Sequence, residues 1–152
     1  SSFLLKRFNY LFNKSETSQS YFQPPLELHE IDYFEEITIN DIKINAIKQN
    51  HGVIDTLGFI FNDVFAYCTD VVGFPEKSFE YLRKMKVLII TGLRQSPHMA
   101  HAHFDLSFEW IAKLNPDVAY LTHLSPESDH DVVTKLCPPN TFPAYDGLVI
   151  NI

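Results

Sequence analysis

The sequence has little cysteine, and this excludes one class of protein. Only Cys68 and Cys137 occur among the 152 residues, too few for the disulfide framework of a small secreted domain. Cys68 lies in an apolar segment, and free cysteines are among the most buried residue types. We therefore predict a buried thiol at Cys68 and a cytoplasmic setting.

Positive charge and long apolar runs are also scarce. Lysine and arginine number 12 against 19 acidic residues, a formal net charge of -7, whereas surfaces that bind nucleic acid are basic. No apolar run approaches the roughly 18 residues of a membrane span. Neither nucleic acid nor membrane is expected as a partner.

The 45% hydrophobic and 20% charged residues fit a globular domain, and the length allows a real core.

The first 25 residues differ in character from the rest. Residues 3–12 are apolar and aromatic, and we expect a helix that needs a partner surface. Residues 13–25 are polar and end in two prolines, which is typical of a loop or a disordered segment. We therefore divide the chain into an N-terminal helix and polar loop, residues 1–25, and a domain over 26–152.

The domain begins with a strand-like pattern. Apolar and polar residues alternate over 36–40 and 42–47 with Asn40-Asp41 between them, which predicts a hairpin. A second hairpin is predicted from 56–61 and 64–68 around Asn62-Asp63, a turn sequence without the usual glycine. These strands are expected to be antiparallel neighbours.

After Asp70 the spacing of the apolar residues changes, and it becomes typical of helices that alternate with buried strands. Helices are predicted over 75–84, 104–114 and 127–136, and strands over 87–90, 118–121 and 148–152. The last helix is expected to bury Val132, Val133 and Leu136. The second half is therefore β-α-β-α-β-α-β, and the fold class is an α/β layered domain with mixed sheet hairpins.

Three metal-type side chains lie at or just past the ends of predicted strands: His51, Asp70 and His123. Their residue types bind zinc, manganese or iron. An open α/β sheet places its site at such strand ends. A single histidine after a strand is equally explained as a hydrogen-bonded structural residue, so the evidence lies in the joint placement of the three.

A second cluster, Ser96-Pro97-His98-Met99-Ala100-His101-Ala102-His103, lies between a strand and a helix. One interpretation is a solvated loop with incidental histidines. The other is a contact to a phosphate or leaving group, assisted by the following helix N-terminus. Arg94 just before the cluster could bind an oxyanion or be a surface residue.

The chain resembles the C-terminal part of a metallo-β-lactamase-fold hydrolase, in the branch that contains phosphoribosyl 1,2-cyclic phosphate phosphodiesterase. The ordered segments that carry the resemblance are LKRFNYLF, YFQPPLELHEID, QNHGVIDTLGFIFNDVFAYCTD, PEKSFEYL, KVLIITGLR, SPHMAH, YLTHLS and AYDGLVI. The resemblance implies part of an αββα sandwich and metal-assisted hydrolysis of a phosphodiester or cyclic phosphate.

The resemblance also implies roles for individual residues. His51 and His123 match metal ligands, Asp70 matches the aspartate that bridges two metals, and His101 matches a histidine that contacts the phosphate or assists the leaving group. Two divalent ions, zinc or manganese, about 3.5–4 Å apart would activate water and polarise phosphoryl oxygens. Arg94 is the candidate for a further substrate contact.

One family motif is absent from the 152 residues. The complete H-x-H-x-D-H segment, whose histidines and aspartate supply the remaining ligands in the family, does not occur here. The chain thus resembles a member without its N-terminal half, and we expect weak or no metal binding by this chain alone. Loss of one sandwich layer would expose apolar surface on the sheet or on residues 3–12, favouring a homodimer or a complementing N-terminal half.

Three interpretations follow from these observations. The first is a hydrolase that is complete only with an N-terminal portion. The second is a non-catalytic truncated remnant that folds or dimerises without a competent metal site. The third, an unrelated α/β domain with incidental histidines, leaves the ordered resemblance unexplained.

Overall fold

The computed structural model describes residues 2–12 and 26–152. It consists of two compact units, residues 1–32 and 33–152, which we describe separately. The predicted polar loop over 13–25, and with it the predicted boundary after residue 25, lies outside the described residues.

The N-terminal unit contains two short helices, α1 (Ser2–Arg7) and α2 (Asn9–Phe12). The predicted helix over 3–12 is therefore interrupted at Phe8. Neither helix buries a residue, and Phe3 and Tyr10 are 67% and 63% exposed. The expectation of exposed apolar side chains in this segment is confirmed.

The second unit is built on a seven-stranded sheet in the order β1 to β7. Its strands are β1 (Glu36–Ile39), β2 (Ile42–His51), β3 (Ile54–Phe61), β4 (Phe65–Cys68), β5 (Val87–Thr91), β6 (Val118–Thr122) and β7 (Thr141–Pro143). Strands β1 to β4 are antiparallel and β4 to β7 are parallel, which confirms the predicted hairpins. Asn62 and Asp63 both have positive φ, 51° and 56°, the conformation of a type I′ turn.

Three helices connect the parallel strands: α3 (Glu76–Leu82), α4 (Phe104–Leu114) and α5 (His130–Leu136). The bounds of α4 are those predicted. The helix ends at Asn115, whose left-handed φ of 51° caps it, immediately before Pro116. The predicted order β-α-β-α-β-α-β is thus confirmed, and the family's α/β fold class with it.

Three predictions for the C-terminal region are wrong. The last strand is Thr141–Pro143 rather than 148–152, because Thr141–Pro143 already pairs with β6. Helix α5 begins at His130 rather than 127, since the Asp129 side chain caps it by accepting from the Val132 backbone nitrogen at 3.0 Å. Of its predicted apolar face only Val133 is buried, while Val132 and Leu136 are exposed.

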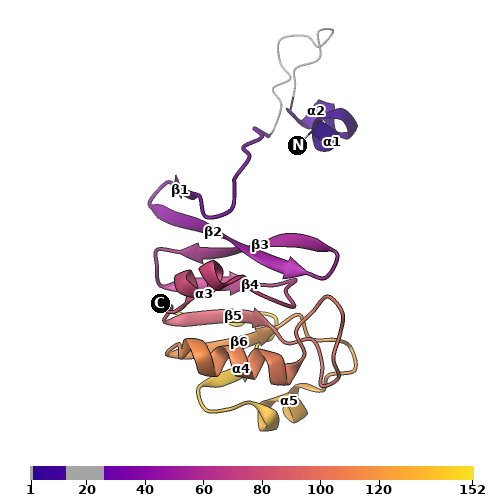
Figure 1. The fold of residues 1–152 in the computed structure, drawn as a ribbon, viewed down its shortest axis with the longest axis vertical. Coiled ribbons are helices and arrows are strands. Elements are labelled where there is room, and N and C mark those ends of the chain that lie inside the picture. The colour runs from indigo at the N-terminus through magenta and orange to yellow at the C-terminus, as the bar shows by residue number, and fades with distance from the viewer. Residues whose placement is uncertain (1, 13–25) are drawn as a thin grey trace. The chain divides into compact units, whose positions relative to one another are not determined.

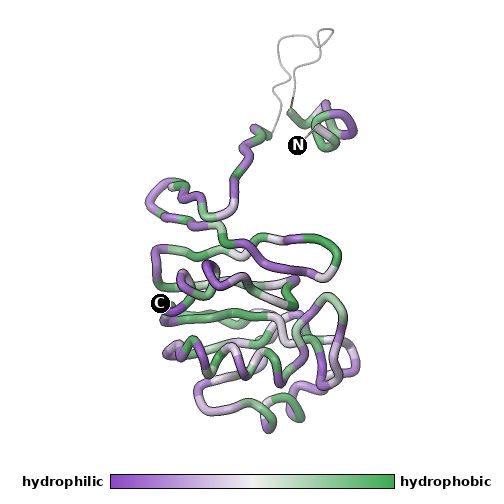
Figure 2. The backbone as a smooth tube through the Cα atoms, viewed as in Figure 1, coloured by the Kyte–Doolittle hydropathy of each residue, from purple (hydrophilic) through white to green (hydrophobic). Residues whose placement is uncertain are grey.

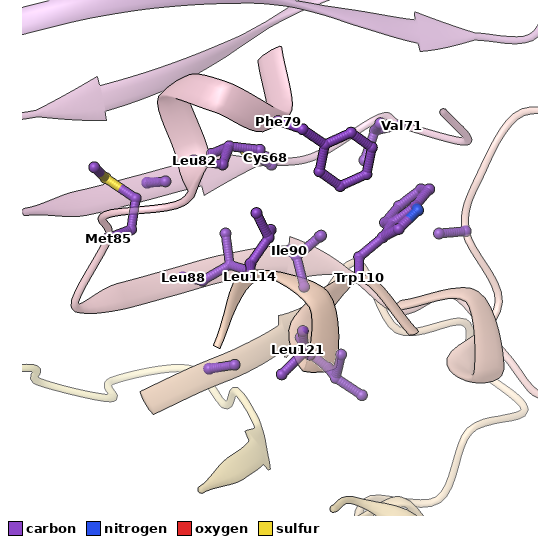
Figure 3. Packing of buried hydrophobic residues seen from close by; sticks show 14 of the residues in the cluster. Cys68, Val71, Phe79, Leu82, Met85, Leu88, Ile90, Trp110, Leu114 and Leu121 are labelled. Atoms are coloured by element: carbon purple, nitrogen blue, oxygen red, sulfur yellow. The ribbon is translucent and has the colours of Figure 1, made fainter. Parts of the chain in front are cut away.

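The hydrophobic core lies between one face of the sheet and the helices (Figure 3). Leu88, Ile90 and Leu121 of the parallel strands pack with Phe79 of α3 and Trp110 of α4 in one buried cluster. Strand β5 is hydrophobic along its length, whereas α4 alternates between hydrophobic and hydrophilic residues (Figure 2). This pattern fits a central buried strand covered by a helix that exposes its other side. Cys68 is in this core, as predicted.

The alternate residues of the strands form a second apolar face. Pairing places Phe59, Tyr67, Ile89, Tyr120 and Phe142 side by side in one row across β3 to β7. Their neighbours along each strand point into the helix-covered core, so this row points to the opposite face. Tyr67 and Phe142 remain 40% and 47% exposed. The sheet therefore has one helix-covered face and one aromatic face that is partly exposed.

The cap of α5 gives a direct stability prediction. Replacing Asp129 with alanine will lower the free energy of unfolding by about 1 kcal/mol, because it removes the acceptor for the Val132 N–H. Urea denaturation measures this loss. Asp131→Ala is the control, since Asp131 lies in the first turn without capping; equal losses in both variants would contradict the capping role.

Candidate metal centre

Four strands end at the same edge of the sheet. Because β2 and β4 are each antiparallel to β3, they run in the same direction, and β5 and β6 run parallel to β4. Figure 1 shows β2 and β5 ending on the same side of the sheet. His51 is the last residue of β2, Asp70 follows β4 by two residues, and His123 directly follows β6. The loop after β5 carries His101.

Backbone hydrogen bonds hold these segments beside one another. The Asn50 nitrogen donates to the Gly73 carbonyl at 2.8 Å, and the Val72 nitrogen donates to the Asn50 carbonyl at 2.8 Å. The Ala102 nitrogen donates to the Val71 carbonyl at 2.7 Å. These bonds join the residues that flank the candidate ligands, so the placement of the ligands depends on main-chain pairing rather than on mobile side chains.

Asp70 is shared between two histidines. Its Oδ1 lies 3.7 Å from Nδ1 of His101 and 3.7 Å from Nε2 of His123. One ligand atom each from His51, Asp70 and His101 lies within 4.8 Å of the others. Asp70 and His123 both have left-handed backbones, with φ of 55° and 62°. Such conformations cost energy in residues other than glycine and concentrate at functional sites.

The histidine rings pack around His101. His123 is stacked on it with ring centroids 4.6 Å apart, and His51 meets it edge-on at 4.5 Å. The His98 ring also stacks with that of His101, at a centroid distance of 5.1 Å. His98 belongs to the predicted cluster over 96–103 but has no predicted role of its own, and its spacing of three residues from His101 is the signal that could have indicated one.

His51 has a defined tautomer. Its Nδ1 lies 2.8 Å from the Ala100 carbonyl oxygen, which can only accept, so Nδ1 carries the proton. The lone pair is then on Nε2, the atom left for a metal. A backbone carbonyl that orients an imidazole in this way is a common arrangement around metal-ligating histidines.

His101 has a buried nitrogen that nothing satisfies. Within residues 2–12 and 26–152, its Nδ1 has no hydrogen-bond partner, although buried polar atoms normally have one. Burial lowers the pKa of His101, and the neighbouring imidazoles of His123 and His51 lower it further. Both effects favour the neutral form of the ring.

These side chains fit a divalent metal. A tetrahedral ion with ligand bonds of about 2.1 Å holds its donor atoms about 3.4 Å apart, close to the 3.7 Å separations at Asp70. Imidazole nitrogens with a carboxylate are the donor set of zinc and related ions. The free Nε2 of His51 agrees with this assignment.

Arg94 is placed differently. Its Nη1 lies 3.1 Å from Oε1 of Glu127, so its charge is paired with a carboxylate. It lines a cavity of about 480 Å³ together with Ser96, Ser128 and residues of α5. The structure thus brings His51, Asp70, His101 and His123 together and pairs Arg94 with Glu127.

The chain belongs to the β-lactamase superfamily domain family, whose pattern matches residues 3–124. Its resemblance to the metallo-β-lactamase fold and to its phosphodiesterase-like branch is confirmed. Among curated proteins no match was found.

Solved structures support the same family. A diphosphatase of the PhnP family is 30% identical with a TM-score of 0.78, over 83% of this chain and 49% of that protein. YhfI of Bacillus subtilis, a metallo-β-lactamase-fold protein, is 16% identical with a TM-score of 0.66, over 95% of this chain and 60% of that protein. The CmlA β-hydroxylase shares the fold at 12% identity and a TM-score of 0.57, over 79% of this chain and 33% of that protein.

The chain spans about half the length of the diphosphatase, 49%. None of the helices in the described part of the chain is long and apolar enough to cross a membrane.

Proposed function

We propose that this chain is the C-terminal part of a metal-dependent hydrolase that acts on phosphodiesters. The observation that carries the proposal is the convergence of His51, Asp70, His101 and His123 at one sheet edge, with Asp70 Oδ1 3.7 Å from two imidazole nitrogens. The family match adds the expectation of hydrolysis. The cytoplasmic setting remains a prediction from the two free cysteines.

Each side chain has a proposed task. His51 presents Nε2 to a metal, with its ring fixed by the Ala100 carbonyl. Asp70 is shared between two metal positions, and His123 serves the second one. When bound, two divalent ions such as zinc or manganese supply an activated water and polarise the phosphoryl oxygens. His101, at the centre of the rings, contacts the phosphate or the leaving-group oxygen.

The proposed substrate is a small phosphodiester or cyclic phosphate. The resemblance of the sequence segments supports it, and the similar PhnP-family diphosphatase supports a phosphate-containing substrate. Arg94 is proposed as a further substrate contact, which requires an anion to compete with Glu127 for its guanidinium. The cavity beside Arg94 has room for such a group.

We further propose that an N-terminal half completes the site. The 152 residues contain no H-x-H-x-D-H segment, and the chain covers 49% of the diphosphatase. The partly exposed aromatic row at Tyr67 and Phe142 is the surface on which a second sandwich layer would pack. A homodimer formed through this face is the alternative arrangement.

Complementation tests the enzyme. Bis-p-nitrophenyl phosphate and an organic diphosphate are assayed with zinc or manganese, using the chain alone and the chain mixed with a polypeptide that carries the H-x-H-x-D-H half. We expect background rates for the chain alone and hydrolysis only in the mixture. No hydrolysis by the metal-loaded mixture would contradict the proposal.

The absent motif also favours a second candidate, the non-catalytic remnant. Calorimetric titration of this chain alone with zinc or manganese distinguishes the two. Catalytic zinc usually has three protein ligands, and Asp70 is shared, so the hydrolase interpretation predicts weak binding that strengthens in the mixture. The remnant interpretation predicts no strengthening.

A further inference from the structure

Gln49 is a buried polar residue of β2 that the proposed function does not use. It is 0% exposed, and its side-chain nitrogen donates to the Thr69 carbonyl at 2.8 Å and to Thr56 Oγ1 at 3.3 Å. A carbonyl only accepts, so the amide must present its nitrogen to Thr69. This contact fixes the orientation of the Gln49 side chain.

Thr56 extends the contact to Asp70. It lies opposite Gln49 in the pairing of β2 with β3, and its hydroxyl donates to the Asp70 carbonyl at 2.8 Å. Strand β4 ends at Cys68, so these two carbonyls lie beyond the strand and need other donors. Two successive carbonyls, those of Thr69 and Asp70, therefore receive side-chain hydrogen bonds from the neighbouring strands.

Fold stability alone does not explain a glutamine here. Among the described residues its Oε1 has no hydrogen-bond partner, and an unsatisfied buried acceptor lowers stability. Gly58 leaves room for it, since a Cβ at position 58 would lie 2.5 Å from that oxygen. An apolar side chain of similar size would remove this unsatisfied acceptor, but it would leave the Thr69 carbonyl without its amide donor. What the amide contributes is the fixed backbone of Thr69 and Asp70.

We infer that Gln49 and Thr56 are positioning residues for Asp70. Their hydrogen bonds hold the backbone at the left-handed φ of 55°, and this conformation directs Oδ1 toward both His101 and His123. The predicted effect on metal affinity rests on the proposed function. The predicted effect on the backbone conformation of Asp70 does not.

Thr56→Val in the full chain tests the inference, because valine keeps the shape and removes the hydroxyl. Without metal, the Cα and Cβ NMR shifts of Asp70 report its φ and are expected to leave their left-handed values. With Mn²⁺ as the only ligand, paramagnetic broadening of nearby amides measures affinity, which is expected to fall on the order of tenfold. Thr56→Ser keeps a hydroxyl and is expected to give wild-type Asp70 shifts and wild-type Mn²⁺ affinity. Gln49→Met is expected to change the Asp70 shifts and lower the Mn²⁺ affinity as Thr56→Val does.

Ser78→Ala is the matched control. The buried Ser78 hydroxyl donates to the Lys48 carbonyl at 2.7 Å, a bond of the same kind that does not involve Asp70. It is expected to lower stability while both readouts stay unchanged. Unchanged Asp70 shifts in Thr56→Val would overturn the inference. If the wild-type chain shows no Mn²⁺ broadening, the titration is repeated in the mixture with the complementing half, and no broadening there contradicts the proposed function. The metal-free shifts decide the role of Thr56 in either case.

Discussion

Replacing Asp70 with asparagine will reduce the affinity of this chain for zinc or manganese by at least about a hundredfold. Changing a residue that only supports a ligand typically costs 10- to 100-fold. Asp70 is itself the proposed ligand, and its Oδ1 lies 3.7 Å from a ring nitrogen of both His101 and His123. The asparagine side chain has the shape of the aspartate side chain without its charge. The loss of affinity therefore measures the attraction of the carboxylate for the cation.

Asparagine is chosen because the fold should tolerate it. Asp70 has a φ of 55°, and asparagine enters the left-handed region more readily than other side chains. Calorimetry and Mn²⁺-induced broadening measure affinity in the chain alone. In the mixture with the complementing half, hydrolysis of bis-p-nitrophenyl phosphate should fall to the background rate.

Asp63→Asn is a close control for this substitution. Asp63 also has a positive φ, 56°, but it lies in the β3–β4 turn and pairs with Lys43 at 2.9 Å. It should change neither metal affinity nor hydrolysis, and stability only slightly, because exposed ion pairs contribute little. Equal metal affinity in Asp70→Asn and wild-type protein would refute the assigned ligand role.

Local sequence determined the elements whose signals agree with their surroundings. The helix 104–114 was predicted to the residue because its apolar period is regular and Pro116 follows its end. The turn at Asn62-Asp63 was predicted without glycine because both residue types tolerate positive φ. In these segments the tertiary contacts favour the same backbone conformation as the local sequence does.

The C-terminal region shows where local signals are insufficient. Residues 148–152 are rich in the β-branched residues valine and isoleucine, as strands are, yet the three residues Thr141–Pro143 take the position beside β6. So short a segment has no readable alternation, and only the edge offered by β6 makes it a strand. Pro143 is acceptable there because an edge strand has one side free of pairing.

The candidate site also has features that the sequence predicts and features that it does not. The placement of His51, Asp70 and His123 could be inferred because strand ends follow from the strands themselves. The Ala100 carbonyl on His51 and the bonds from Gln49 and Thr56 to the Asp70 turn could not, since they join residues distant in sequence. The roles of the site residues remain predictions.

Replacing Gly52 with valine will both destabilise the protein and disturb the hydrogen bond that orients the His51 ring. Gly52 follows His51 with a φ of 77°, and a Cβ there would lie 3.0 Å from the Met99 oxygen and 3.4 Å from the Ala100 Cβ. The left-handed backbone costs a branched residue roughly 1–2 kcal/mol, and overpacking costs roughly 1–3 kcal/mol more. We expect the free energy of unfolding to fall by about 2–5 kcal/mol in urea denaturation.

The same substitution should release the His51 ring. Valine must push the loop at Met99 and Ala100 away, and that loop supplies the carbonyl 2.8 Å from His51 Nδ1. Nitrogen-15 NMR of the imidazole should then show a mixture of tautomers where the wild type shows a proton on Nδ1, and Mn²⁺ affinity should fall with it.

Gly147→Val separates backbone strain from contact with the loop. Gly147 has a φ of 89°, and a Cβ there would meet no atom of the described residues within 4 Å. This variant should lose only the roughly 1–2 kcal/mol of the left-handed conformation and keep both the His51 tautomer and the Mn²⁺ affinity. If Gly52→Val also keeps the wild-type tautomer, the Ala100 carbonyl does not fix His51, and its free Nε2 must have another cause.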